Sequence, residues 1–233
     1  AMPVQGEEVT LMKFRNFGFA IALLATSQMV YAVPVSVMNS GFETPLLADG
    51  AQSSSAAGWT RFGSVSFTNP TTSQFTGEAY EGQNIALFTG GATLTQIVGT
   101  IAYGTYTLTA AVGDPLGASL SGVGLSLRRG TSFLSPSSTS FVPPADGGYS
   151  IFSRVYAVTA ENANGTFFGD QFNIFALVSS SSGQVAVDDI RLDFSPVPEP
   201  AIFALLVFGL AGLGLQVLSR NFTVLRRRNL KRA

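Results

Sequence analysis

Carboxylates and aromatic rings are the side chains in this sequence that could do chemistry, because two other reactive types are absent. The 233 residues include no histidine and no cysteine. A Ser-His-Asp triad, a cysteine nucleophile, a disulfide framework and a thiolate metal site are therefore excluded. No phosphate loop, zinc motif or nucleophile elbow is present. Residues 33–195 carry eleven carboxylates, and a glycosidase needs two, but no spacing singles out a pair.

Aromatic rings are the usual platform for binding a sugar. Trp59 is the only tryptophan, and Phe62, Tyr80 and Tyr103 are further candidates. We take Trp59 and Tyr80 as the predicted ligand contacts. The alternative is burial, because aromatic side chains more often lie in a core, and Trp59 opens a predicted strand.

Short strands must position these side chains. No stretch between residues 33 and 195 keeps a helical period, whereas several alternate with the period of two that half-buried strands have. The clearest alternation lies at 105–112, 122–127 and 172–178. Shorter candidates lie at 35–38, 58–67, 84–88, 92–98 and 149–159. Turns rich in Gly, Pro, Asn, Asp and Ser separate them, so the pattern predicts an antiparallel β-sandwich of eight or nine strands.

The last predicted strand changes phase. Val185 and Val187 have one parity, while Ile190 and Leu192 have the other. Both sets should face the core, so a β-bulge is expected at Asp188-Asp189.

Three local patterns resemble one family. They are Asn39-Ser40-Gly41-Phe42-Glu43 at the start, Gly104-Thr105-Tyr106-Thr107-Leu108 in the middle and Val187-Asp188-Asp189-Ile190-Arg191-Leu192 at the end. In this order they resemble the galactose-binding-like jelly rolls, which include many carbohydrate-binding modules. The resemblance implies a jelly-roll sandwich in which the opening Phe-Glu meets the closing Asp-Asp and often holds a structural calcium.

For such a calcium ion we expect Glu43 and Asp188 as ligands, with backbone carbonyls and Asp189, because Ca²⁺ prefers mixed oxygen ligands. The alternative is that Glu43 caps a turn and the two aspartates solvate a strand end.

The N-terminal region, 1–32, reads as an extension followed by a secretory signal that starts at Met12. Lys13 and Arg15 form a short basic region, and an apolar run and a small-residue site follow. We expect cleavage after Ala32. A retained N-terminal anchor is the alternative, although the apolar run is short for a membrane span.

The C-terminal region, 196–233, reads as a membrane-bound tail. Residues 201–218 contain no charge and would be about 27 Å long as a helix, close to the thickness of the bilayer core. One acid and six bases give this region a net charge of +5, and a basic end stays in the cytoplasm. The layout predicts an exported domain, 33–195, with a cytoplasmic C-terminus.

Pro198-Glu199-Pro200 stands just before this apolar run. Together with the run and the arginines that follow, it resembles the PEP-CTERM sorting tail of Gram-negative bacteria. The resemblance implies recognition by an exosortase and transfer from the inner membrane to the cell surface or extracellular matrix. An unprocessed single-pass anchor is the alternative.

Charge limits the partners of the exported domain. Eleven acidic and five basic side chains give residues 33–195 a net charge of −6, which argues against nucleic acid. We therefore predict a non-enzymatic surface protein that binds polysaccharide or other matrix components. A purely structural or adhesive matrix protein is the alternative, and a glycoside hydrolase is a remote one.

Overall fold

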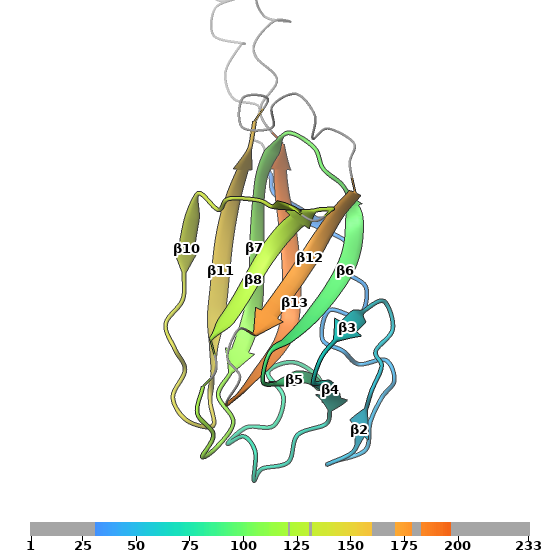
Figure 1. Ribbon diagram of the computed structural model, residues 1–233, viewed down its shortest axis with the longest axis vertical. Helices are drawn as coiled ribbons and strands as arrows, with labels where there is room; N and C mark the ends of the chain where they lie inside the picture. Colours follow the sequence, from blue (N-terminus) through green and yellow to red (C-terminus); the bar gives the residue numbers. More distant parts are fainter. Residues whose placement is uncertain (1–30, 121, 131, 160–170, 179–182, 197–233) are drawn as a thin grey trace, which may run out of the picture. The chain divides into compact units, whose positions relative to one another are not determined.

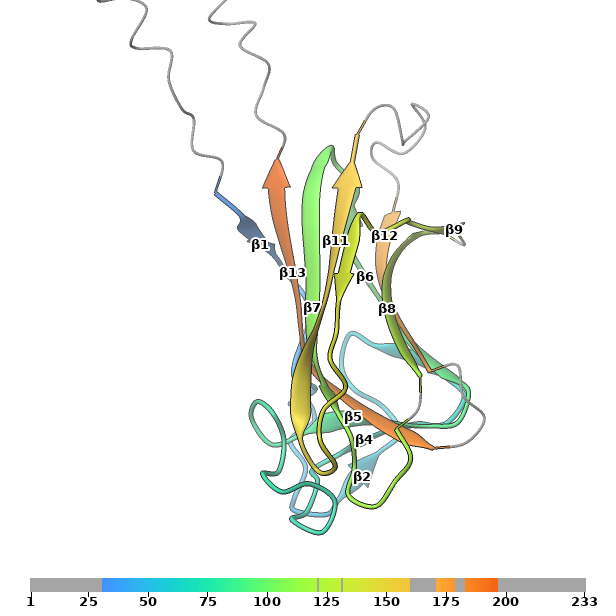
Figure 2. The same ribbon diagram turned by 90° about the vertical axis from the view of Figure 1, so that its left-hand side faces the viewer.

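Two antiparallel sheets form the fold of the computed structural model, which describes residues 31–120, 122–130, 132–159, 171–178 and 183–196 (Figure 1). Sheet A has the order β10 (Ser138–Ser140), β11 (Tyr149–Val158), β7 (Gly104–Gly113), β13 (Gln184–Pro196), β5 (Ile85–Thr89), β4 (Val65–Thr68) and β2 (Gln52–Ser53), and β1 (Val33–Val35) pairs with β13. Sheet B has the order β3 (Thr60–Phe62), β6 (Ala92–Thr100), β12 (Gln171–Val178), β8 (Val123–Arg129) and β9 (Ser132–Phe133). The sheets lie face to face (Figure 2).

The predicted all-β sandwich is confirmed, with differences in the short strands. The described residues contain thirteen strands, five of which have only two or three residues. The single strand expected at 58–67 is wrong, because the chain turns at Gly63 and places β3 in sheet B and β4 in sheet A. Gly63 has a φ of 80°, and a methyl group there would lie 2.8 Å from the Gly91 carbonyl oxygen. The turn therefore needs glycine.

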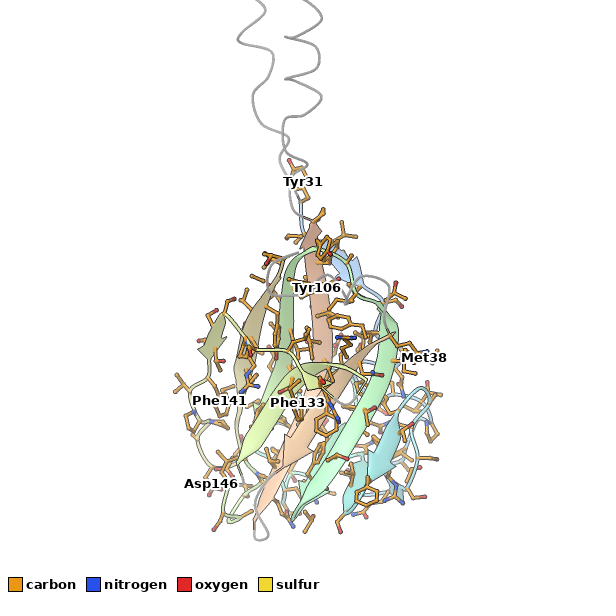
Figure 3. All side chains as sticks on the ribbon, turned by 45° about the horizontal axis from the view of Figure 1, so that its top comes forward. Tyr31, Met38, Tyr106, Phe133, Phe141 and Asp146 are labelled. Atoms are coloured by element: carbon orange, nitrogen blue, oxygen red, sulfur yellow. The ribbon has the colours of Figure 1, made fainter. Side chains whose placement is uncertain are left out.

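The core fills the space between the two sheets. Leu108 from sheet A and Leu125 and Leu127 from sheet B are fully buried. Tyr106 packs against Phe172 of the opposite sheet, with 4.8 Å between the ring centroids (Figure 3). These are the residues whose alternation predicts the strands, so the pattern of two corresponds to a real inner face.

Arg154 joins the two sheets at the open edge of β8. It lies on β11, and its guanidinium donates hydrogen bonds to the Leu125 carbonyl oxygen at 2.7 Å and to Ser126 Oγ at 2.8 Å. Because an edge carbonyl near a core lacks a sheet partner, this contact satisfies a group that would otherwise cost free energy.

The bulge expected in the last strand is present. The pairing of β13 with β7 shifts register between Asp188 and Arg191, and Asp189 has a φ of 46°. Val187 before the bulge and Ile190 after it are both fully buried. The extra residue therefore keeps both halves of β13 on the core and leaves Asp188 on the other face.

Several predicted segments lie outside the described residues. These are residues 1–30 of the predicted signal region, the Pro198-Glu199-Pro200 motif and the predicted span 201–218. Within the described ranges, no helix has the length and apolar character needed to cross a membrane.

Candidate functional site

A loop over residues 78–84 covers the bulge of β13 and fixes two carboxylates. Glu43 Oε1 accepts hydrogen bonds from the backbone N–H groups of Gln83 and Asn84, each at 2.8 Å. The loop turns at Gly82, whose φ is 65°, and a methyl group there would lie 2.4 Å from Glu43 Oε1. The two hydrogen bonds fix the position of the Glu43 carboxylate and stabilise the loop.

Asp188 is the buried member of this group. Its side chain is inaccessible to solvent, and its two oxygens accept backbone hydrogen bonds from Glu81 at 2.9 Å and from Asp189 at 2.7 Å. Burial raises the pKa of Asp188 to about 7, against the two hydrogen bonds, and the charges of Asp189 and Glu43 add to the rise. In this environment the carboxyl group lacks a compensating positive charge.

The structure brings Glu43 and Asp188 together, as the resemblance implies. A methyl group on Gly41 would lie 3.6 Å from Asp188 Oδ1 and 3.9 Å from Glu43 Cγ. The opening and closing segments also join through the backbone, because the N–H of Ile190 donates to the Ser40 carbonyl oxygen at 3.1 Å. The two predicted ligands therefore converge from opposite ends of the domain.

Arg191 forms ion pairs with two further carboxylates beside Glu43 and Asp188. Arg191 Nε contacts Asp189 Oδ1 at 2.7 Å, and its terminal nitrogen lies 3.5 Å from Glu81 Oε2. The pKa of Glu81 is raised, chiefly by its hydrogen bond to the Asp189 carboxyl group. We call Glu43, Glu81, Asp188 and Asp189 the carboxylate cluster, for which Arg191 is the one cation that the described contacts supply.

The cluster has features that a divalent cation would satisfy. Asn84 is fully buried and donates through Nδ2 to the Phe42 and Pro45 carbonyls, but its Oδ1 atom has no hydrogen-bond partner. Glu43, Asp188 and the Asn84 amide oxygen are hard oxygen donors, the type that Ca²⁺ prefers. No group of three or more Asp, Glu, His or Cys side chains with ligand geometry occurs among the described residues, so amide and backbone oxygens would have to complete the shell.

The predicted aromatic contacts have different environments. Trp59 is only 8% exposed, its Nε1–H donates to the Asn39 carbonyl oxygen at 2.9 Å, and its ring packs on Phe42. The structure thus places Trp59 in the core, away from any ligand surface. Tyr80 is 47% exposed and lies 5.9 Å from the ring of Tyr149, which stacks on Phe75. It keeps the surface position that a ligand contact needs.

A groove of about 330 Å³ adjoins the cluster along the paired strands β1 and β13. Its lining consists of Pro34, Val35, Val37, Ser40, Ile190, Arg191, Leu192 and Asp193. The lining combines apolar with polar groups, and the volume lies at the small end of the range of small-molecule sites. Arg191 belongs to both places, so the groove and the cluster are continuous. Sequence reasoning missed the groove, because it forms only where the first strand of the domain pairs with the last.

Comparison with known families decides the kind of protein. The sequence model of the HpiC1-like family, described as HpiC1 cyclase, matches residues 33–193. The chain belongs to the HpiC1-like family. The prediction of a protein without catalytic activity is therefore wrong, because this is a family of cyclases. The absence of histidine and cysteine excludes several catalytic devices, but it leaves acid–base chemistry by carboxylates available. No curated protein sequence matches the chain.

Similar solved structures agree with this fold. A Stig cyclase from Fischerella sp. TAU, crystallised with (3Z)-3-(1-methyl-2-pyrrolidinylidene)-3H-indole, has 20% identity and a TM-score of 0.62, covering 72% of this chain and 100% of its own. A cyclase from the same source, crystallised with 4-(1H-indol-3-yl)butan-2-one, has 21% identity and a TM-score of 0.59 over the same shares. At this identity the similarity shows the fold alone.

A xylan-binding domain from Paenibacillus barcinonensis is also similar. It has 11% identity and a TM-score of 0.46, covering 74% of this chain and 100% of its own. The score is too low to carry an argument about ligands.

Proposed function

We propose that this protein is a cyclase that closes a ring in a small apolar substrate. The family match over residues 33–193 carries the proposal, since it spans nearly all of the β-sandwich. The ligands crystallised with the Fischerella cyclases contain an indole ring. We therefore take an aromatic, indole-bearing compound as the substrate class.

The groove between β1 and β13 is the proposed substrate site. Val35 and Val37 supply apolar side chains that are partly buried against the core, and Asp193 is the one carboxylate in the lining. A substrate in the groove would lie beside the Asp193 carboxyl group. Asp193 then gives its proton to the substrate as the new bond forms. The resulting carboxylate removes a proton from the cyclised cation, so the product is an isomer of the substrate and the acid is regenerated.

Two substitutions test this site in the purified full-length protein. Val35→Trp should fill the groove and abolish binding of 4-(1H-indol-3-yl)butan-2-one, measured by calorimetry. Asp193→Asn should keep binding and lower turnover of an indole-bearing substrate panel, followed as a mass-neutral change in retention, by about 100-fold or more. Phe62→Ala, on sheet B, is the matched control and should change neither. Binding or turnover that survives Val35→Trp would place the site elsewhere.

A structural Ca²⁺ in the carboxylate cluster is a second proposal. The buried, unpartnered Oδ1 atom of Asn84 favours it, together with the convergence of Glu43 and Asp188. Such an ion would stabilise the junction of the first and last strands without taking part in turnover. Calcium should raise the melting temperature of the parent protein, and Glu43→Gln should abolish that rise. An equal rise in parent and variant would contradict the ligand assignment.

Export and sorting complete the proposal. The signal region before Ala32 and the Pro198-Glu199-Pro200 tail support delivery by an exosortase from the inner membrane to the cell surface or extracellular matrix. Replacing Glu199 and its neighbouring prolines with alanine should leave a full-length species in the inner membrane, seen by fractionation. Normal surface delivery of this variant would argue against exosortase recognition.

A further inference from the structure

The outer face of sheet B is a candidate surface that the proposed cyclase chemistry does not use. Its side chains alternate with core residues along each strand. Thr60 and Phe62 come from β3, Thr93, Thr95 and Ile97 from β6, Asn173 and Phe175 from β12, Ser126 and Arg128 from β8, and Phe133 from β9. We call these ten residues the outer face of sheet B.

Strand register arranges the outer face in rows. One row runs through Thr60, Thr95, Phe175 and Ser126, and the next runs through Ile97, Asn173, Arg128 and Phe133. Five strands at a spacing of about 4.8 Å make the face roughly 19 Å wide. In Figure 2 the strand β8 is bowed, with its hollow side turned away from sheet A. The face can therefore accommodate an extended ligand across the strands.

Apolar side chains on this face are open to solvent. Phe62 is 79% exposed, Ile97 58% and Phe133 55%. The guanidinium carbon of Arg128 lies 4.6 Å from the Phe133 ring centroid and 4.5 Å from that of Phe175. Arg128 therefore makes a cation–π contact with each ring. Phe133 lies over β8 in Figure 3. Hydroxyl and amide groups of Thr95, Ser126 and Asn173 stand between these apolar groups.

Charge separates this face from the rest of the domain. None of the strands of sheet B contains Asp or Glu, whereas the nine acidic residues of the described ranges lie on sheet A or in loops. Three of the five described arginines, Arg61, Arg128 and Arg129, lie on strands of sheet B. Arg128 has outward parity, and the other two add positive potential from the same sheet. Among the described residues, this distribution of charge favours an anionic ligand on sheet B over one on sheet A.

We propose that the outer face of sheet B binds an acidic polysaccharide and holds the cyclase in an extracellular matrix. Rings of Phe62 and Phe133 would contact the apolar faces of the sugars, and Thr95, Ser126 and Asn173 would bond to their hydroxyl groups. The Arg128 guanidinium, held against the Phe133 and Phe175 rings, would attract a uronate carboxylate. This role is independent of the groove and of turnover.

The test uses the full-length protein in affinity electrophoresis, with a linear polyuronate as probe and neutral dextran as the comparison polymer. Parent protein should be retarded by the polyuronate only, and less so at high salt. Phe133→Ala and Phe62→Ala should each weaken retardation about tenfold, the effect of removing one stacking contact worth roughly 1–1.5 kcal/mol. Arg128→Gln should weaken it and reduce its dependence on salt.

Tyr80→Ala, on the loop over sheet A, is the matched control and should bind like the parent. Circular dichroism and turnover of each variant confirm that the fold and the groove are intact. The proposal is overturned if the parent does not bind, if dextran binds equally, or if Tyr80→Ala rather than Phe133→Ala removes binding. A concentration-dependent dimer that Phe133→Ala dissociates, without polyuronate binding, would instead make this face a contact between copies of the chain.

Discussion

Replacing Asp188 with asparagine is the sharpest test of the carboxylate cluster. The side chain is fully buried and its pKa is raised from 3.8 to about 7. Because the folded state binds this proton more tightly than the unfolded state, the contribution of Asp188 to stability is fully present below pH 3.8 and is lost as the pH rises through about 7. Asparagine cannot ionise, so it removes this dependence on pH. Its amide nitrogen cannot accept one of the two backbone hydrogen bonds that Asp188 accepts, so the variant also loses a constant amount of stability at every pH.

The size of the effect follows from the shift. A change of about three pKa units corresponds to up to roughly 4 kcal/mol of unfolding free energy between pH 4 and pH 8. Urea unfolding in EDTA should therefore show the parent losing up to roughly 4 kcal/mol relative to Asp188→Asn between pH 4 and pH 8. The parent should be the more stable of the two at pH 4, where Asp188 is protonated and both of its hydrogen bonds are present.

Calcium should oppose the loss of parent stability at pH 8. A cation bound to the Asp188 carboxylate favours the ionised form, so the parent should regain stability at pH 8 while the variant does not. Parallel pH curves for parent and variant in EDTA would refute the electrostatic reasoning. An unchanged difference on adding calcium would refute the metal proposal and leave the buried acid.

Three further substitutions test the packing that positions the site. Gly82→Ala should destabilise the fold by about 1–2 kcal/mol, because alanine is strained at a φ of 65° and its methyl group would meet the Glu43 carboxylate, and thermal unfolding measures this; an unchanged melting temperature would show that the loop shifts freely. Arg154→Met should cost about 1–3 kcal/mol in urea unfolding, since it leaves the Leu125 carbonyl with only the long 3.5 Å hydrogen bond from the Tyr156 hydroxyl; no loss would mean that water replaces the guanidinium. Leu108→Ala should cost about 2–5 kcal/mol at a fully buried position, and a loss below 1 kcal/mol would contradict its place in the core.

The difference between Trp59 and Tyr80 shows the limit of reading aromatic residues from sequence. Both are isolated aromatic residues near turns, and composition does not show which of the two is buried. In the structure Trp59 lies under Phe42 with its indole N–H bonded, whereas Tyr80 rests on Tyr149 with almost half of its surface in water. The distinction depends on which neighbours the chain brings from far along the sequence.

Local alternation in the sequence by itself determined the all-β architecture, the core faces of the long strands and the bulge at Asp188-Asp189, because the side chains of a strand point alternately to its two faces. Residue types alone also excluded histidine and cysteine chemistry. Only the tertiary structure decided that Glu43 and Asp188 both bond to the loop over residues 78–84, and that a groove opens beside Arg191. It alone also decided that the described strands of sheet B present an outer face without Asp or Glu. Each of these depends on pairing between strands that are distant in sequence, such as β1 with β13 and β3 with β6. No local period records such pairing, because it is selected by the packing free energy of the whole sandwich.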